Sequence, residues 1–133
     1  MSQARITSPD ASAEYFFEEG CFILELSNSV DDPALSIARA RVEPGCITRL
    51  HRLAHQVERY VILDGEGWVE VGETVAGPVK AGDVVIIPAG ASQRIRNTGD
   101  RDLVFLALCT PRFEPKDYAD IDPAPMDRGN LGD

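Results

Sequence analysis

PGCITRLHRLAHQVERYVILDGEG, residues 44 to 67, is the segment from which we derive both a fold and a candidate site. It contains both histidines of the chain, His51 and His55, and Glu58 follows them closely. Imidazole and carboxylate groups bind transition metals and move protons near neutral pH. We therefore expect any chemistry of this protein to involve this segment.

The composition is that of one globular domain, with 133 residues of which 44% are hydrophobic and 26% charged. No apolar run approaches the roughly 20 residues of a membrane-spanning helix. The first residues lack the basic-then-apolar order of a signal peptide, and the three cysteines form no CxxC pair, so we expect reduced thiols and a cytoplasmic location. The net charge of -9 repels nucleic-acid phosphates and anionic lipids, so neither is an expected partner.

Short strands separated by turn residues are expected along most of the chain. Residues 34–42 alternate with a period of two, and Asp64-Gly65 predicts a two-residue hairpin whose partner strand is Trp68–Val71. A loop is expected from Gly72 to Pro78, because glycine and proline punctuate it. Repeated short strands of this kind predict an all-β fold, either an antiparallel sandwich or a small barrel.

The histidine segment itself has two interpretations. Apolar side chains recur at helical spacing from Leu50 to Tyr60, and a helix there would place His51, His55 and Glu58 on one face, suited to a metal. The β-branched and aromatic residues 60–62, the hairpin signal after them and the strand-like character of everything downstream favour two strands joined by a loop. We expect the strands, and a helical circular dichroism spectrum would support the alternative.

Ten residues form two spaced patterns, one within this segment and one downstream of it. They are Gly45, His51, Leu53, Glu58 and Gly65, followed by Gly82, Pro88, Gly90, Gln93 and Asn97. The patterns resemble the two motifs of the cupin superfamily and match them at eight of the ten positions. The resemblance covers about residues 34 to 110. The short connection between the two motifs is similar to that in small bacterial single-domain cupins. It implies a small antiparallel jelly-roll β-barrel that is usually a homodimer.

Both mismatches fall on positions that bind metal in cupins, which normally carry His, His, Glu and His where this chain has His51, Leu53, Glu58 and Gln93. Residues i and i+2 of a strand point to one face about 6.6 Å apart, so the leucine takes the place of the second imidazole. His55 can join only if the chain turns sharply after Leu53. The expected metal ligands are therefore His51, Glu58, Gln93 and His55, for Mn, Fe, Zn or Ni. A metal-free polar cluster is the alternative.

Strand alternation from these positions predicts the rest of the pocket. The residues expected to contact a substrate are Arg49, Tyr60, Gln93 and Ile95. An arginine on an inward face is costly without an anionic partner, so Arg49 indicates a small anionic or polar ligand. Arg39 and Arg41 either serve the same purpose or lie on the outer face, paired with surface acids, and the outer placement is favoured.

Glu58 and Tyr60 are the candidate catalytic residues. A carboxyl group inside an apolar barrel has a raised pKa, which suits proton abstraction next to a carbonyl. The cupin resemblance implies isomerase, epimerase or dioxygenase activity, with oxygen activation disfavoured by the altered ligand set. A metal-free, non-catalytic binding or sensor module is the alternative.

The ends of the chain differ in composition from its centre. We expect an N-terminal arm at residues 1–20, the barrel at 21–112 and an irregular, acidic, proline-containing tail at 113–133. The aromatic cluster at residues 15–17 is expected to pack on the barrel or on a second subunit. Phe113 and Tyr118 are expected to hold the first part of the tail against the domain.

Overall fold

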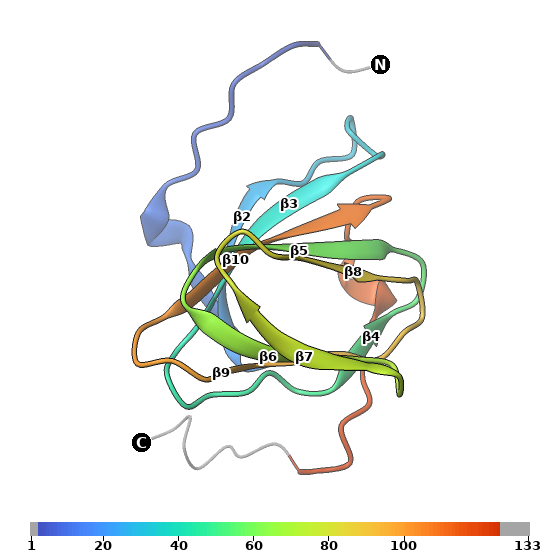
Figure 1. Ribbon diagram of the computed structural model, residues 1–133. Helices are drawn as coiled ribbons and strands as arrows, with labels where there is room; N and C mark the ends of the chain where they lie inside the picture. Colours follow the sequence, from blue (N-terminus) through green and yellow to red (C-terminus); the bar gives the residue numbers. More distant parts are fainter. Residues whose placement is uncertain (1–2, 126–133) are drawn as a thin grey trace.

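The computed structural model describes residues 3–125 and shows an all-β protein of two antiparallel sheets that face each other (Figure 1). The six-stranded sheet contains, in spatial order, β1 (Tyr15–Phe17), β2 (Cys21–Ser27), β3 (Ser36–Val42), β10 (Leu103–Thr110), β5 (Val57–Asp64) and β8 (Val84–Ile87). The five-stranded sheet contains β11 (Tyr118–Asp120), β4 (His51–Leu53), β9 (Gln93–Asn97), β6 (Glu66–Val71) and β7 (Val75–Lys80). Two 3-10 turns, η1 (Ala11–Ala13) and η2 (Pro115–Asp117), precede β1 and β11. The predicted jelly-roll β-barrel is confirmed.

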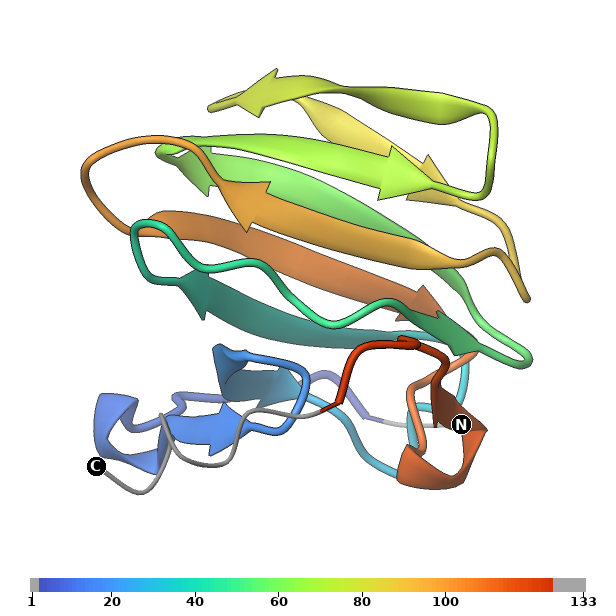
Figure 2. The same ribbon diagram turned by 90° about the horizontal axis from the view of Figure 1, so that it is seen from below.

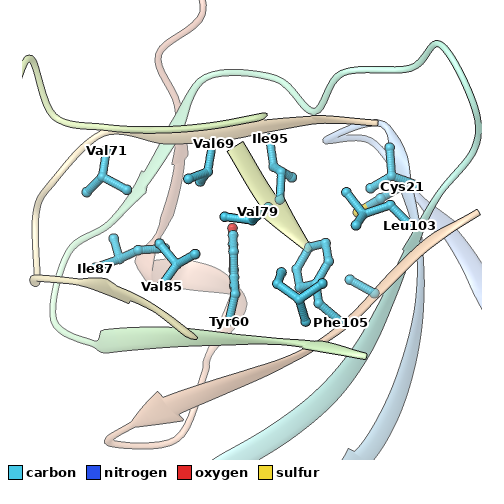
Figure 3. Packing of buried hydrophobic residues seen from close by; sticks show 13 residues of the cluster. Cys21, Tyr60, Val69, Val71, Val79, Val85, Ile87, Ile95, Leu103 and Phe105 are labelled. Carbon is cyan, nitrogen blue, oxygen red and sulfur yellow. The ribbon is translucent and has the colours of Figure 1, made fainter. Parts of the chain in front are cut away.

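The core lies between the sheets because each strand alternates buried and exposed side chains. In β5, Glu58, Tyr60 and Ile62 are buried, whereas the residues between them lie on the outer face. Figure 3 shows Val69 and Ile95 of the five-stranded sheet pointing toward Tyr60 and Phe105 of the other sheet. The apolar stretches of the sequence thus form one continuous cluster along the barrel axis.

The helical interpretation of the histidine segment is wrong. Residues 51–53 form β4 and residues 57–64 form β5, with a bend between them. β5 pairs with β10 on one side and β8 on the other, so its backbone groups are satisfied by neighbours distant in sequence. These long-range pairings outweigh the helical spacing of the apolar residues.

Two local predictions are corrected by the sheet topology. The chain does turn at Gly65, but β5 and β6 belong to different sheets, and β6 pairs with β7 and β9. Gly65 has a φ of +87°, and a Cβ atom there would lie 2.6 Å from the carbonyl oxygen of Asp102, so the glycine permits a close crossing between sheets. The predicted loop at residues 72–78 is largely strand β7, which tolerates Pro78 because it is an edge strand.

Both flanking segments join the barrel. β1 pairs with β2, and β11 pairs with β4, so the aromatic cluster at residues 15–17 and the start of the tail pack on the protein's own sheets. Figure 2 shows the blue N-terminal strands and the red segment after β10 on the same side of the barrel. Within the part of the chain that the structure describes, no helix has the length and apolar character needed to cross a membrane.

Candidate functional site in the barrel

A cavity of about 70 Å³ opens where the flanking segments meet the barrel. Its walls come from β1 to β5, from β10 and from the segment that leads into β11. The polar side chains on the wall that carry most of its chemistry are Glu19, Glu25, His51, Glu58, Tyr60 and Tyr118. The remaining surface is aromatic and aliphatic, which is the usual character of a small-molecule site.

His51 stands at the start of β4 and is 2% exposed. Its Nδ1 lies 2.7 Å from the carbonyl oxygen of Arg49, which can only accept, so Nδ1 carries a hydrogen. Its Nε2 lies 3.2 Å from Oε2 of Glu19, and the ring stacks on Tyr118 with centroids 5.2 Å apart. His51 and Glu19 are therefore within ion-pair range of each other on the cavity wall.

Glu58 projects from β5 into the same cavity and is 8% exposed. Its Oε2 accepts a hydrogen bond from the Cys109 thiol at 3.6 Å, whereas its Oε1 is buried and has no partner within residues 3–125. Burial and, next, the negative charge of Glu19 raise the pKa of Glu58 to about 7, against the opposing effects of His51 and of the nearby Gln93 and Cys109 side chains. Glu58 thus has both protonation states available near neutral pH.

Tyr60 and Gln93 form a hydrogen-bonded pair behind Glu58. The Tyr60 hydroxyl donates to Oε1 of Gln93, and both residues are almost fully buried. Burial and the charge of Glu58 raise the pKa of Tyr60 well above its ordinary value, so this phenol is a hydrogen-bond donor. Gln93 faces His51 across the β4–β9 pairing, but its side-chain oxygen is already occupied by Tyr60.

Comparison with known proteins agrees with this arrangement. The family model of the cupin domain matches residues 38–109, more than half of the chain. The chain belongs to the cupin family. The resemblance drawn from the ten motif positions is confirmed.

Individual cupins share different amounts of this chain. The oxalate-binding protein of Thermotoga maritima is 41% identical over 81 residues, which cover 60% of this chain and 65% of that protein. Oxalate decarboxylase of Lactobacillus farciminis, solved as a formate complex, has a TM-score of 0.70 at 23% identity, over 81% of this chain and 33% of that one. The nucleoside dehydratase Pac13 has a TM-score of 0.71 at 16% identity, over 86% of this chain and 90% of that one. Because both identities are below 25%, these two solved structures support the shared fold alone.

Four residues predicted for the cupin site lie outside the cavity wall. One is Gln93, which is buried and accepts from the Tyr60 hydroxyl. The His55 side chain is 72% exposed, and its Nδ1 lies 2.9 Å from Asp117. The guanidinium of Arg49 binds Asp120 at 2.6 Å, because β4 begins only at His51 and strand alternation does not extend back to residue 49. Ile95 points inward but is completely buried in the core. The favoured outer placement of Arg39 and Arg41 is confirmed, since both pair with Glu14.

Sequence reasoning missed much of the wall because it comes from the ends of the chain. Glu25 lies on the same face of β2 as Cys21 and Ile23. Strand alternation could therefore have predicted Glu25 as a wall residue, because it is an acid on an otherwise apolar face. Burial raises the pKa of Glu25. Tyr118 was expected to hold the tail against the domain, but nothing local placed Tyr118 or Glu19 in the cavity, since each reaches it through pairing with a distant segment.

The metal site of the family was tested against these side chains. Leu53 cannot coordinate, the oxygen of Gln93 accepts from Tyr60, and the exposed His55 lies in the β4–β5 bend and pairs with Asp117. Within residues 3–125, no three His, Cys, Asp or Glu side chains gather closely enough to hold one ion. The residues present do not fit the four-ligand cupin metal centre.

Proposed function

We propose that this cupin binds a small polar molecule in its barrel and that Glu58 exchanges a proton with it, in chemistry of the isomerase or epimerase type. The observation that carries the proposal is Glu58 itself, a side chain of the cavity wall whose buried Oε1 has no hydrogen-bond partner among the described residues. A buried carboxyl oxygen left unpaired is costly, and a ligand that supplies the missing hydrogen bond recovers that cost.

The surroundings of Glu58 suit this role. A general base or acid works best when its pKa lies close to the working pH, and the pKa of Glu58 is about 7. Its other oxygen, Oε2, accepts from the Cys109 thiol, so the carboxyl group is held in one orientation on the cavity wall. The hydroxyl of Tyr118 also has no partner within residues 3–125 and supplies a second hydrogen-bonding position for the ligand.

The competing proposal is a divalent metal on His51, Glu58 and Gln93, with or without His55, binding an anion. Oxalate decarboxylase of Bacillus subtilis has Mn(II) centres, and the Thermotoga relative is named for oxalate binding. In this chain, an anion without a metal would face the carboxylates of Glu25 and Glu58. An anionic ligand therefore requires the metal, whereas the metal-free proposal requires a ligand without net negative charge.

Metal analysis of protein purified without chelator or histidine tag separates these proposals. We expect less than stoichiometric Mn, Fe, Zn and Ni, and a melting temperature that does not change on chelation. A stoichiometric metal that is lost in His51→Ala would contradict the metal-free proposal. Proton exchange is tested with Glu58→Gln, which should abolish turnover of any substrate found by screening, even at substrate concentrations that saturate the variant.

We also propose a cytoplasmic homodimer. Small single-domain cupins are usually dimeric, and the neighbouring strands β5 and β8 expose Leu63, Val84 and Ile86 on their outer face. All three cysteines are free, as expected in a reducing compartment. Light scattering in solution should give twice the chain mass, and Ile86→Glu should shift that mass toward the monomer.

A further inference from the structure

We propose that the ligand of the barrel carries an organic ammonium group, held by Glu25 and Glu58 against the aromatic wall of the cavity. This inference rests on the proposed ligand pocket and names the class of molecule that the pocket takes. It replaces the anionic ligand that Arg49 suggested, because the guanidinium of Arg49 is bound to Asp120 and is absent from the wall.

The charge of the wall favours a cation. Three carboxyl groups line it, those of Glu19, Glu25 and Glu58, whereas no lysine or arginine among residues 3–125 does. His51 is the one wall residue in that range able to carry positive charge, and its Nε2 is already engaged by Glu19. Glu25 takes part in none of the ion pairs found within residues 3–125. A bound cation would therefore compensate charges that the protein itself leaves unpaired.

Aromatic rings cover much of the remaining wall. They belong to Tyr15, Phe17, Tyr60, Phe105, Phe113 and Tyr118. The face of an aromatic ring carries negative electrostatic potential and attracts ammonium groups, most strongly where water is excluded. Phe17 packs edge-to-face on Tyr118 with centroids 5.1 Å apart, so two of these rings are held at a steep angle to each other. Rings at different orientations can surround an alkylated nitrogen on more than one side.

An independent observation identifies where such a group would bind. Oε1 of Glu58 belongs to a side chain that is more than nine-tenths buried, lies on the wall and has no partner among the described residues. This oxygen can accept an N–H from a protonated amine, forming a charge-assisted hydrogen bond. Within residues 3–125, no three His, Cys, Asp or Glu side chains gather closely enough to hold one metal ion. A carboxyl-bearing wall with large ring faces therefore matches an organic cation of several atoms better than a bare metal.

Paired probes of equal shape and different charge test the inference on the full chain at pH 7.5. The small pair is propan-2-amine and propan-2-ol, and the larger pair is choline and 3,3-dimethylbutan-1-ol. Calorimetry or ligand-observed NMR should show the ammonium member of at least one pair binding about tenfold more tightly than its uncharged partner. Sodium oxalate should bind more weakly than that ammonium compound.

Variants place the bound cation in the cavity. Glu25→Gln should weaken binding of the preferred ammonium probe about tenfold, whereas Glu43→Gln, an equal change of net charge at an exposed residue away from the wall, should leave it unchanged. Tyr15→Leu should weaken the same probe without affecting its uncharged partner, and it remains informative if Glu25→Gln fails to fold.

The possible failures separate the inference from the proposed function. Equal binding of charged and uncharged partners, preference for oxalate, no binding of either ammonium probe, or an unchanged affinity in Glu25→Gln would each overturn the ammonium inference. In the first of these cases the pocket itself still binds a small polar molecule, so the proposed function stands. A stoichiometric metal contradicts the proposed function directly, whatever the ammonium probes do.

Discussion

The centre of the chain and its two flanking segments contribute different things to one pocket. The centre, residues 38–109, matches the cupin domain and contains His51, Glu58 and Tyr60. The flanks supply Glu19 and Glu25 from one end and Tyr118 from the other. The barrel is thus specified by the part that resembles other cupins, whereas most of the pocket's negative charge comes from outside that part. Likeness to a family over the barrel alone therefore identifies the fold better than the ligand.

The largest expected effect is a loss of stability in the centre. Ile95→Ala removes a fully buried side chain of the core and should lower the free energy of unfolding by about 4 kcal/mol. Urea denaturation followed by circular dichroism measures this. Ile6→Ala in the N-terminal arm, where the residue is 93% exposed, is the matched control and should cost less than about 0.5 kcal/mol. Similar losses in both variants would show that Ile95 is not the core residue described.

The next effect lies where centre and flank meet, at Glu58. The pKa of this group is about 7 in the folded protein and 4.5 for an ordinary glutamate, so between these pH values the folded state holds a proton that the unfolded chain has released. Stability from this group is therefore complete below pH 4.5 and is lost as the pH rises to 7. This loss is absent in Glu58→Gln. The unfolding free energy of the variant minus that of the wild type should therefore increase by about 3 kcal/mol between pH 4 and pH 8.

Denaturation of both proteins across this pH range provides the measurement, and the difference between them removes the titration of all other groups. Parallel stability profiles would mean that Glu58 is not the buried, charge-repelled carboxyl group described. If stability falls with rising pH in the variant but stays level in the wild type, the pKa of Glu58 is lowered on folding, not raised.

The smallest effects compare one chemical change in the two regions. Tyr60→Phe leaves the buried oxygen of Gln93 without its donor and should cost about 2 kcal/mol. Tyr118→Phe removes a hydroxyl that has no partner among residues 3–125, so its stability should change by less than about 1 kcal/mol. Thermal or urea unfolding of the two variants checks this ordering. Equal costs would indicate that the Tyr118 hydroxyl is bonded in solution.

The barrel could be predicted because its signals are local or regularly spaced. Asn97, for example, is a motif residue whose side chain donates to the carbonyl groups of Val42 and Arg101. The fold needs an amide side chain at this position, so the motif predicts the fold. Strand spacing likewise placed His51 and Glu58 on adjoining walls. The Asp64-Gly65 signal correctly marked a turn, but a turn signal carries no information about which sheet receives the following strand.

The pocket could be predicted only in part because its other contacts join residues that are far apart in sequence. Arg49 binds Asp120, and His51 stacks on Tyr118 and contacts Glu19. These contacts join segments far apart in sequence, so no local pattern predicts them. Expected ligand contacts at Arg49 and Ile95 were derived by counting along strands, and that count fails where a strand has not yet begun or where the side chain is already packed.

The pairing of β11 with β4 also bears on how a ligand exchanges with solvent. β11 has three residues and lies at the edge of the five-stranded sheet, so its local opening breaks its pairing with β4 and the Arg49–Asp120 ion pair but leaves the two facing sheets paired. Such an opening would carry Tyr118 away from His51 and uncover the cavity. Hydrogen exchange at residues 118–120 should therefore be faster than in β5 or β10, and a bound ligand should slow it by closing this segment over the barrel.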